Sequence, residues 1–372
     1  MLDNILNFVQ NEENLGEQFV RKVKDGKHPF YCYGAGHYLQ FSLAYLKKSG
    51  LKPIAILDTN YNGKYGEFDV VAYESFLKSN SDPDCIFVIT APSHREEIRE
   101  KLTKNFKSQN IYSFETEIYL NFFPNINKYR HYLIEHWQEL IAFKNDLKDE
   151  VSKQTFDCVL QGRISGNQDY FSICYAPDQY YPKDLMEFST DEVMVELGSN
   201  NGDTLLGFLQ HCPQFKRIYC FEPDKNCIPL LEKIKQSQKE YVNKIIIEQK
   251  GAWSNTTTLY FSLEGNVIAG NGHLVSNMSH ATETINVVAI DDVISEPITY
   301  MKMDIEGCEL EALHGAEKQI IENKPMLAIC VYHKMNDFTD IWSYLKHLNP
   351  DYKFYLRHHN KFSATETVLY AI

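Results

Sequence analysis

The residues of this chain that could do chemistry are concentrated in two runs of carboxylates and glycines. The first run is Val195 to Asp203, Val-Glu-Leu-Gly-Ser-Asn-Asn-Gly-Asp, and the segment Tyr219 to Asp224 follows it after a short helical pattern. An apolar strand, a glycine turn, a helix and a second strand ending in an acid are typical of a nucleotide-binding doubly wound sheet. We therefore predict that a nucleotide-containing cofactor binds at this turn.

The details of the turn discriminate between cofactors. A dinucleotide site normally reads G-x-G-x-x-G, whereas Gly198 and Gly202 are four residues apart and no third glycine follows. The residues beside these glycines are polar or acidic, namely Glu196, Asn200, Asn201 and Asp203. Carboxylates repel a pyrophosphate but attract a ligand with an ammonium and a sulfonium, which favours S-adenosylmethionine. Glu222, at the end of the next strand, is placed to accept hydrogen bonds from two ribose hydroxyls.

The second run is Lys302-Met303-Asp304-Ile305-Glu306-Gly307. On an extended backbone Lys302, Asp304 and Glu306 share one face, and they converge at the carboxyl end of a strand, where open α/β sheets bind ligands. Asp304 could act as a base, and Glu306 could orient an acceptor or join a metal site. His333, at the end of the following strand, is a second candidate base because its ordinary pKa lies near neutrality. Ion pairing or helix capping is the structural alternative for the acids.

Metal binding is not predicted. The carboxylates are numerous enough for a hard cation such as Mg²⁺, but their spacing does not establish a site. They are Asp291, Asp292, Asp304 and Glu306.

Composition limits the class of protein. The 372 residues suggest two domains, and the hydrophobic share of 44% is that of a folded protein. A net charge of -13 argues against nucleic acid or an anionic membrane as a partner. Nine scattered cysteines without a C-x-x-C pair, no signal-peptide pattern at Met1 to Gln10 and no apolar run of membrane-spanning length predict a cytoplasmic protein.

The elements that must position these residues divide the chain into three predicted parts. Residues 1–113 predict a small Rossmann-like α/β domain with N-terminal helices, and residues 114–153 predict a helical connector. Residues 154–372 form the predicted second domain. Its segment 154–185 lacks regular alternation, so we expect an irregular cover over the mouth of the domain.

From residue 192 onward strands and helices alternate regularly, with a single helix expected over 309–322. We expect the polar loop Gly265 to Thr282 to cover a ligand. The last two strands, 353–358 and 367–371, are joined by a link too short for a parallel crossover. The sequence therefore predicts a seven-stranded doubly wound sheet with a reversed edge strand, which distinguishes a methyltransferase from a dinucleotide dehydrogenase.

Seven motifs then occur in a characteristic order. They are Gln179-Tyr180-Tyr181-Pro182, Val195 to Asp203, Phe221-Glu222-Pro223-Asp224, Gly251-Ala252-Trp253-Ser254, Ile290-Asp291-Asp292, Tyr300 to Gly307 with Glu309 and Gly315-Ala316, and the strand ending at His333. With these motifs, residues 154–372 resemble the FkbM family of S-adenosylmethionine-dependent methyltransferases. The family commonly has Asp where Glu196 stands and Ala or Tyr near Ser199, so this chain is a chemically equivalent variant.

The resemblance implies a class I methyltransferase fold and a set of functional residues. The implied catalytic residues are Lys302, Asp304, Glu306 and His333. The implied cofactor-binding residues are Gln179, Tyr181, Glu196, Gly198, Asn200, Gly202, Asp203, Glu222, Pro223, Gly251, Ala252, Trp253 and Asp304. In related methyltransferases the residues after the third strand bracket the adenine, so Trp253 is expected to stack on the base; an ordinary core tryptophan is the alternative.

The N-terminal part resembles the small nucleotide-sugar-binding Rossmann-like domain found before sugar acyltransferases. The matching pieces are Gly34-Ala35-Gly36-His37, Ile56-Leu57-Asp58, Gly66 with Val70-Val71, and Phe87 to Thr90. The resemblance implies a nucleotide sugar as a partner, whereas packing or homodimerisation is the alternative role of such a domain.

These observations predict an S-adenosylmethionine-dependent O-methyltransferase. The expected acceptor is a hydroxyl of a small molecule: a sugar, a sugar phosphate or a glycosylated intermediate. One alternative is a nucleotide-sugar oxidoreductase that binds NAD in the N-terminal domain, although the glycine fingerprint at Gly34 to Gly36 is incomplete. A second alternative is a non-catalytic binding protein that keeps the methyltransferase fold.

Overall fold

The computed structural model describes residues 2–26, 28–80, 82–123, 125–262, 273–274 and 283–372. The chain forms two compact units. The first comprises residues 1–137, 154–175 and 360–365, and the second comprises 138–153, 176–359 and 366–372. Neither unit is one continuous segment, and the domain boundaries expected after residues 113 and 153 remain a prediction. Among the described residues, no helix combines the length and apolarity needed to cross a membrane.

The first unit is built on a six-stranded sheet. Its strands are β1 (Phe30–Tyr33), β2 (Ile56–Asp58), β3 (Gly63–Tyr65), β4 (Phe68–Ala72), β5 (Ile86–Ile89) and β6 (Ile111–Tyr112). Their order is β3-β4-β2-β1-β5-β6, with β3 antiparallel to β4 and the other pairs parallel. The strand order reverses beside β1, as it does in doubly wound sheets, and the carboxyl ends of β1, β2 and β5 lie at that point.

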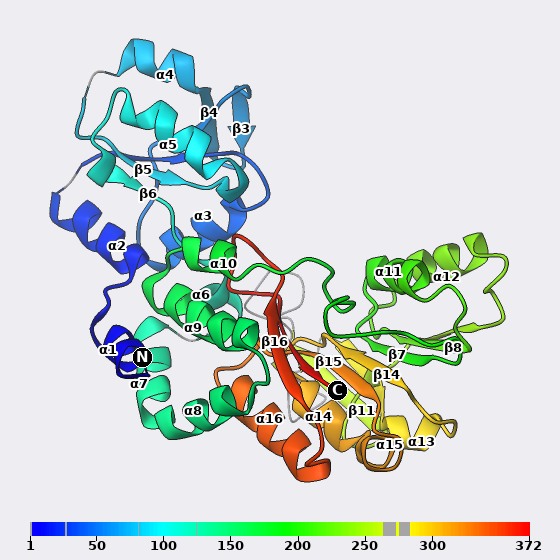
Figure 1. Ribbon diagram of the computed structural model, residues 1–372. Helices are drawn as coiled ribbons and strands as arrows, with labels where there is room; N and C mark the ends of the chain where they lie inside the picture. Colours follow the sequence, from blue (N-terminus) through cyan, green and yellow to red (C-terminus); the bar gives the residue numbers. More distant parts are fainter. Residues whose placement is uncertain (1, 27, 81, 124, 263–272, 275–282) are drawn as a thin grey trace. The chain divides into compact units, whose positions relative to one another are not determined.

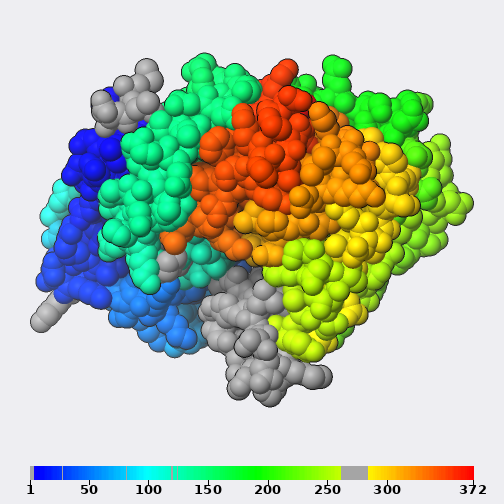
Figure 2. All heavy atoms as spheres, turned by 90° about the horizontal axis from the view of Figure 1, so that it is seen from below, coloured from blue at the N-terminus to red at the C-terminus, as the bar shows by residue number. Residues whose placement is uncertain are grey.

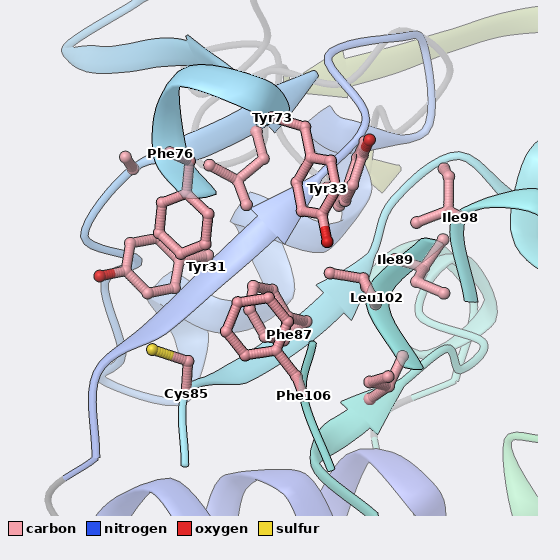
Figure 3. Close-up of a cluster of buried hydrophobic side chains, with 13 residues drawn as sticks. Tyr31, Tyr33, Tyr73, Phe76, Cys85, Phe87, Ile89, Ile98, Leu102 and Phe106 are labelled. Carbon is pink, nitrogen blue, oxygen red and sulfur yellow. The ribbon is translucent and has the colours of Figure 1, made fainter. Parts of the chain in front are cut away.

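Helices cover both faces of this sheet (Figure 1): α2 (Leu15–Gly26) and α3 (Leu39–Lys48) pack on one face, and α4 (Tyr73–Ser79) and α5 (Arg95–Thr103) on the other. The unit also contains α1 (Leu2–Asn11), α6 (Glu117–Asn121) and α7 (Ile126–Glu135). Successive residues of β1 point to opposite faces, so Tyr31 and Tyr33 join one buried cluster while Phe30 and Cys32 join another. The first cluster, shown in Figure 3, packs β1 and β5 against α4 and α5.

The second unit contains a seven-stranded sheet. Its strands are β7 (Val193–Leu197), β8 (Arg217–Phe221), β9 (Ile245–Glu248), β14 (Tyr300–Met303), β15 (Met326–Cys330), β16 (Phe354–His358) and β17 (Thr367–Ala371). The order is β16-β17-β15-β14-β7-β8-β9, and β17 alone runs antiparallel to its neighbours. A seven-stranded sheet with a reversed last strand is therefore confirmed.

The predicted edge position of the reversed strand is wrong. β17 lies between β15 and β16, so β16 is the edge strand. A short link makes the last two strands neighbours but does not decide which of them is inserted. All five residues of β17 are buried, as a strand with a neighbour on each side requires.

Helices also flank the seven-stranded sheet. They include α11 (Asp203–His211), α12 (Ile228–Ser237), α13 (Ile290–Val293), α14 (Glu309–His314), α15 (Glu317–Asn323) and α16 (Asp337–Leu348). Helices α11 and α12 lie on one side of the sheet in Figure 1, and α13 to α16 lie on the other. Figure 2 shows the residues of α13 to α16 side by side, in yellow to orange.

A small second sheet follows β9. Its strands are β10 (Gly251–Ala252), β11 (Thr257–Ser262), β12 (His273–Leu274) and β13 (Glu283–Val288), in the order β10-β13-β11-β12. The loop expected over Gly265 to Thr282 lies outside the described residues except for β12, so its expected role as a cover remains a prediction.

Two predicted elements differ in the structure. Residues 154–185 were expected to be irregular, but α9 (Glu150–Ser165) and α10 (Asp169–Ile173) occupy much of this segment, after α8 (Trp137–Asp146). Gly162 misled the prediction, because it is a packing glycine: a Cβ there would lie 2.5 Å from the ring of Phe171. The single helix expected over 309–322 is divided into α14 and α15 at Gly315, where a Cβ would lie 2.0 Å from the carbonyl oxygen of Trp253.

Candidate active site

The glycine turn after β7 passes very close to the end of β14. Gly198 has φ +81°, and a Cβ on it would lie 1.9 Å from the carbonyl oxygen of Asp304. Gly202 has φ +83° and precedes the first residue of α11. Only glycine adopts such backbone conformations without strain, and at position 198 only glycine also fits the space. Gly198 therefore lets the turn pack against Asp304, whereas Gly202 lets it pack against Ile234.

Glu222 follows β8 and holds the turn from the other side. Its carboxylate is 7% exposed and accepts hydrogen bonds from the backbone N–H groups of Asn200, at 2.7 Å, and Asp224, at 2.8 Å. Asn200 has φ +44°, which asparagine tolerates better than most residues. Pro223 is half-buried beside Glu222, and Asp203 is exposed in the first turn of α11. Each oxygen of Glu222 keeps further acceptor capacity.

Glu196 lies beneath the turn rather than at its surface. Its side chain is fully buried, as is that of Ser199. In the sheet Glu196 stands opposite Lys302. Burial raises the pKa of Glu196, and the charge of Lys302 opposes that shift.

Lys302 connects the two predicted runs. Its side chain is buried, its ammonium donates a hydrogen bond to the carbonyl oxygen of Gly198 at 2.7 Å, and it lies 5.0 Å from the centre of the Tyr180 ring. Burial lowers the pKa of Lys302, but the charges of Asp304 and Glu196 outweigh burial and raise it above its usual value. Lys302 is therefore a buried cation that fixes the turn.

Asp304 is the partly accessible carboxylate next to this cation. Its side chain is 23% exposed, and it accepts hydrogen bonds from the hydroxyls of Tyr180, at 2.8 Å, and Tyr332, at 3.3 Å. Burial raises the pKa of Asp304, but the charges of Lys302 and His333 outweigh burial and lower it. Asp304 is consequently ionised at neutral pH.

His333 lies among three carboxylates. Its Nδ1 is 2.9 Å from Oε1 of Glu309, and its Nε2 is 3.4 Å from Oδ1 of Asp304 and 3.7 Å from Oε2 of Glu306. Burial lowers the pKa of His333, but these carboxylates outweigh burial and raise it to about 10. The structure thus brings Lys302, Asp304, Glu306 and His333 together at the carboxyl ends of β14 and β15.

Gln179 and Tyr181 lie near this region but make structural contacts. Gln179 donates a hydrogen bond to the carboxylate of Glu366. The hydroxyl of Tyr181 donates to the carbonyl oxygen of Thr204 at 2.7 Å, and its ring stacks on His211. These contacts hold the start and the end of α11, so they are compatible with a supporting role for Tyr181.

Gly251, Ala252 and Trp253 belong to the small sheet and the residue that follows it. Gly251 and Ala252 form β10 beside β13, and the backbone N–H of Trp253 donates to the carbonyl oxygen of Val288 at 2.9 Å. Trp253 is half-buried. This hydrogen bond fixes the backbone of Trp253 and says nothing about its ring, so stacking of the ring on adenine remains a prediction.

Several residues of the site were absent from the predicted set. They are Tyr180, Glu309, Tyr332 and Glu366, which contact Asp304, His333 or Gln179. Tyr180 and Tyr332 each adjoin a residue that was predicted, and Glu309 belongs to a motif of the resemblance but was given no role at the site. No sequence pattern indicated that Glu366, the residue before β17, belongs to the site.

The comparisons with known proteins agree with this architecture. Residues 196–354 match the model of the methyltransferase FkbM domain. A crystal structure of methyltransferase FkbM from Methylobacillus flagellatus KT is 24% identical and superposes with a TM-score of 0.77, over 95% of this chain and 93% of that chain. This likeness establishes a shared fold over nearly the whole chain and confirms the predicted α/β methyltransferase architecture.

Two other solved structures are similar over a smaller part. An rRNA methylase from Streptococcus thermophilus is 14% identical over 50% of this chain and 88% of that chain, with a TM-score of 0.33. Fibrillarin from Aeropyrum pernix, solved with natively bound S-adenosyl-L-methionine, is 12% identical over 51% of this chain and 71% of that chain, with a TM-score of 0.32. The comparison with curated proteins gives no match. Residues 196–354 of this chain are thus similar to a methyltransferase FkbM domain, and the chain has the fold of a methyltransferase.

Proposed function

We propose that this domain transfers a methyl group from S-adenosylmethionine to a hydroxyl oxygen of a sugar, a sugar phosphate or a glycosylated intermediate. The observation that carries the proposal is the position of Glu222, whose carboxylate is held against the glycine turn by the N–H groups of Asn200 and Asp224. Its remaining lone pairs suit two ribose hydroxyls. The cofactor supplies the methyl group on a sulfonium.

The electrostatics of the turn support a cationic ligand. Asp203 is exposed at the start of α11, and Glu196 and Glu222 add carboxylates below and beside the turn. Because Glu196 is fully buried, we assign it an electrostatic role rather than direct contact with the cofactor. Because Gly198 has no side chain, the turn can lie directly against Asp304.

Asp304 is the base that we assign to the acceptor. It is ionised and partly exposed, and the hydroxyls of Tyr180 and Tyr332 fix its orientation. Because the pKa of His333 is raised, its ring is protonated at neutral pH. A protonated ring has no lone pair with which to take the proton of the acceptor hydroxyl. We therefore assign His333 to positioning Asp304 and Glu306 instead of proton removal.

We further propose that the first unit binds the nucleotide part of a nucleotide sugar. Asp58, at the end of β2, accepts a hydrogen bond from the N–H of Ala35 in the glycine turn after β1, at 3.1 Å. This is the same relationship that joins Glu222 to Asn200 in the second unit, at 2.7 Å. An acid held in this way suits the hydroxyls of a ribose. Homodimerisation and a cytoplasmic location remain predictions.

The release of S-adenosylhomocysteine in the presence of a panel of acceptors tests the proposed reaction. The panel contains free sugars, sugar phosphates and nucleotide sugars, with matched deoxy analogues as controls. We expect product with at least one hydroxylated acceptor, none with its deoxy analogue, and a loss of roughly 100-fold or more in Asp304→Asn, the size of general-base contributions. Equal turnover by wild type and Asp304→Asn would remove Asp304 from the mechanism.

A further inference from the structure

The group around His333 combines one imidazole with carboxylates from three positions of the chain. Asp304 and Glu306 follow β14, Glu309 begins α14, and His333 follows β15. Ligand atoms of Asp304, Glu309 and His333 all lie within 4.8 Å of one another. Imidazole nitrogen and carboxylate oxygen are the ligands that first-row divalent cations such as Mn²⁺ and Zn²⁺ accept.

The distances on the Nε2 side of the ring match the spacing of ligands around one cation. Two ligand atoms that each lie about 2.1 Å from a cation are about 3.0–3.5 Å apart at octahedral or tetrahedral angles. Nε2 of His333 is 3.4 Å from Oδ1 of Asp304 and 3.7 Å from Oε2 of Glu306. Both separations exceed those of a strong hydrogen bond. The Glu306 side chain is 52% exposed, so it has room to rotate and shorten the longer separation.

On the opposite side of the His333 ring, Nδ1 has a carboxylate partner of the kind that orients metal-binding histidines. Oε1 of Glu309 lies 2.9 Å from Nδ1 and also accepts a hydrogen bond from the N–H of Ile305 at 3.0 Å. A carboxylate on Nδ1 keeps the proton there and directs Nε2 at a metal. The second oxygen of Glu309 is buried and has no hydrogen-bond partner in the described part of the chain. His333 and Glu309 are each only 1% exposed, so the ring orientation is built into the core.

The backbone at Glu306 gives an independent indication of a functional constraint. Glu306 has φ +56°, a conformation that is costly for a residue with a Cβ and is found most often at functional sites. Gly307 follows with φ +90°, and a Cβ on it would lie 3.4 Å from Cβ of His333. The tight turn brings the carboxylate of Glu306 back toward the ring.

Charge balance also favours a cation. The charged groups that face His333 are Asp304, Glu306 and Glu309, and the neighbouring groups are Lys302, Asp337 and Lys334. Three carboxylates around one ring leave an excess of negative charge beside a ring that is only 1% exposed. A divalent cation neutralises that excess and displaces the proton on Nε2.

We propose that Nε2 of His333, Oδ1 of Asp304 and Oε2 of Glu306 bind one divalent cation, with Mn²⁺ and Zn²⁺ as the best-suited ions, and that Glu309 orients His333. In one further step, which rests on the proposed function, the cation would also hold the acceptor hydroxyl, whose proton would then pass more readily to the carboxylate of Asp304.

The test uses the full chain after treatment with a chelator and its removal. Mn²⁺ is added, and free Mn²⁺ is followed by its electron paramagnetic resonance signal. We expect one Mn²⁺ per chain, competition by Zn²⁺, and a nitrogen modulation in the spin-echo spectrum from a directly bound imidazole. Glu309→Gln should weaken binding by 10- to 100-fold, the effect of removing an outer partner of a ligand.

Two further variants keep the test informative even where a buried substitution impairs folding. Glu306→Gln changes a half-exposed residue and should weaken Mn²⁺ binding at least tenfold while the thermal unfolding temperature changes little. Glu322→Gln makes the same change at an exposed position of α15 and should leave binding unchanged. Absence of Mn²⁺ and Zn²⁺ binding, or binding that is equal in wild type and Glu306→Gln, overturns the proposal. S-adenosylmethionine binding is measured separately, so its loss does not count against the metal site.

Discussion

The ammonium of Lys302 donates a hydrogen bond to the carbonyl oxygen of Gly198, 104 residues earlier in the chain, over 2.7 Å. This contact joins the glycine turn after β7 to the charged run at the end of β14. Lys302 also stands opposite Glu196 in the sheet, so its charge compensates a carboxylate that is fully buried. One side chain therefore positions the proposed cofactor turn and the proposed base together.

Lys302→Met tests this compensation. Removing the cation leaves Glu196 and Asp304 without their buried counter-charge, and we expect a loss of about 3–5 kcal/mol in the free energy of unfolding, measured in urea. The double variant Lys302→Met with Glu196→Gln should regain at least about 1 kcal/mol, since one of the uncompensated charges is gone. Equal stability of the single and double variants would contradict the coupling of these two residues.

Gly198→Ala tests the close approach of the turn. The new Cβ would lie 1.9 Å from the carbonyl oxygen of Asp304 at a φ of +81°, so we expect a loss of at least about 2 kcal/mol in the free energy of unfolding. Gly36→Ala is the matched control, because no heavy atom lies within 4 Å of its added Cβ. That variant should stay within about 0.5 kcal/mol of wild type; similar losses in both variants would show that the predicted clash is relieved at little cost.

Tyr180→Phe and Tyr181→Phe remove neighbouring hydroxyls with different partners. Tyr180 donates to Asp304, so its variant should reduce turnover by about tenfold or more, as expected for a lost hydrogen bond to a charged group. Tyr181 donates to the carbonyl oxygen of Thr204, so its variant should lose about 1 kcal/mol of stability with little change in turnover. Product formation and thermal melts measure the two effects. A reversed pattern would assign the chemistry to Tyr181.

Glu115 should give the stability of the protein a pH dependence. Its buried carboxyl accepts hydrogen bonds from the N–H groups of Glu117, at 2.7 Å, Ile118, at 3.2 Å, and Ala364, at 3.1 Å. Burial, aided by the charge of Glu117, raises the pKa of Glu115 from 4.5 to about 8. Between these values the folded state holds a proton that the unfolded state has lost, so this contribution to stability falls as the pH rises from about 5 to 8.

The variant Glu115→Gln isolates that contribution. The difference in unfolding free energy between wild type and variant should shift against wild type across this interval, by at most about 1.4 kcal/mol per pH unit. Urea unfolding at several pH values measures it. A difference that is constant between pH 5 and 8 would place the pKa of Glu115 near its ordinary value.

The sequence predicted much of the second unit because its strands carry continuous apolar runs. The bounds of β17 were predicted to the residue, and the shared face of Lys302, Asp304 and Glu306 follows from strand geometry alone. The insertion of β17 between β15 and β16 depends on which strand is more deeply buried, which local periodicity does not encode. Helix α9 was missed because a glycine inside a helix resembles a loop signal until its packing partner is known.

The same limit applies to the candidate site. The acids and glycines at strand ends were recognisable from their spacing, and they do converge. The residues that interact with these acids and with His333 were not recognisable from the sequence. Tyr180, Tyr332 and Glu309 come from segments that contact Asp304 and His333 only in the folded chain. A raised pKa for His333 could not have been inferred from its place after a strand.

Calorimetric titration of the purified chain with S-adenosylmethionine tests the central claim most directly. We predict one cofactor per chain and an affinity that falls roughly 10- to 100-fold in Glu222→Gln, because one charged acceptor is lost. Glu232→Gln, at a partly exposed position of α12, should bind like wild type. A folded wild-type chain that binds no S-adenosylmethionine, or a Glu222→Gln variant that binds it as tightly as wild type, would contradict the account.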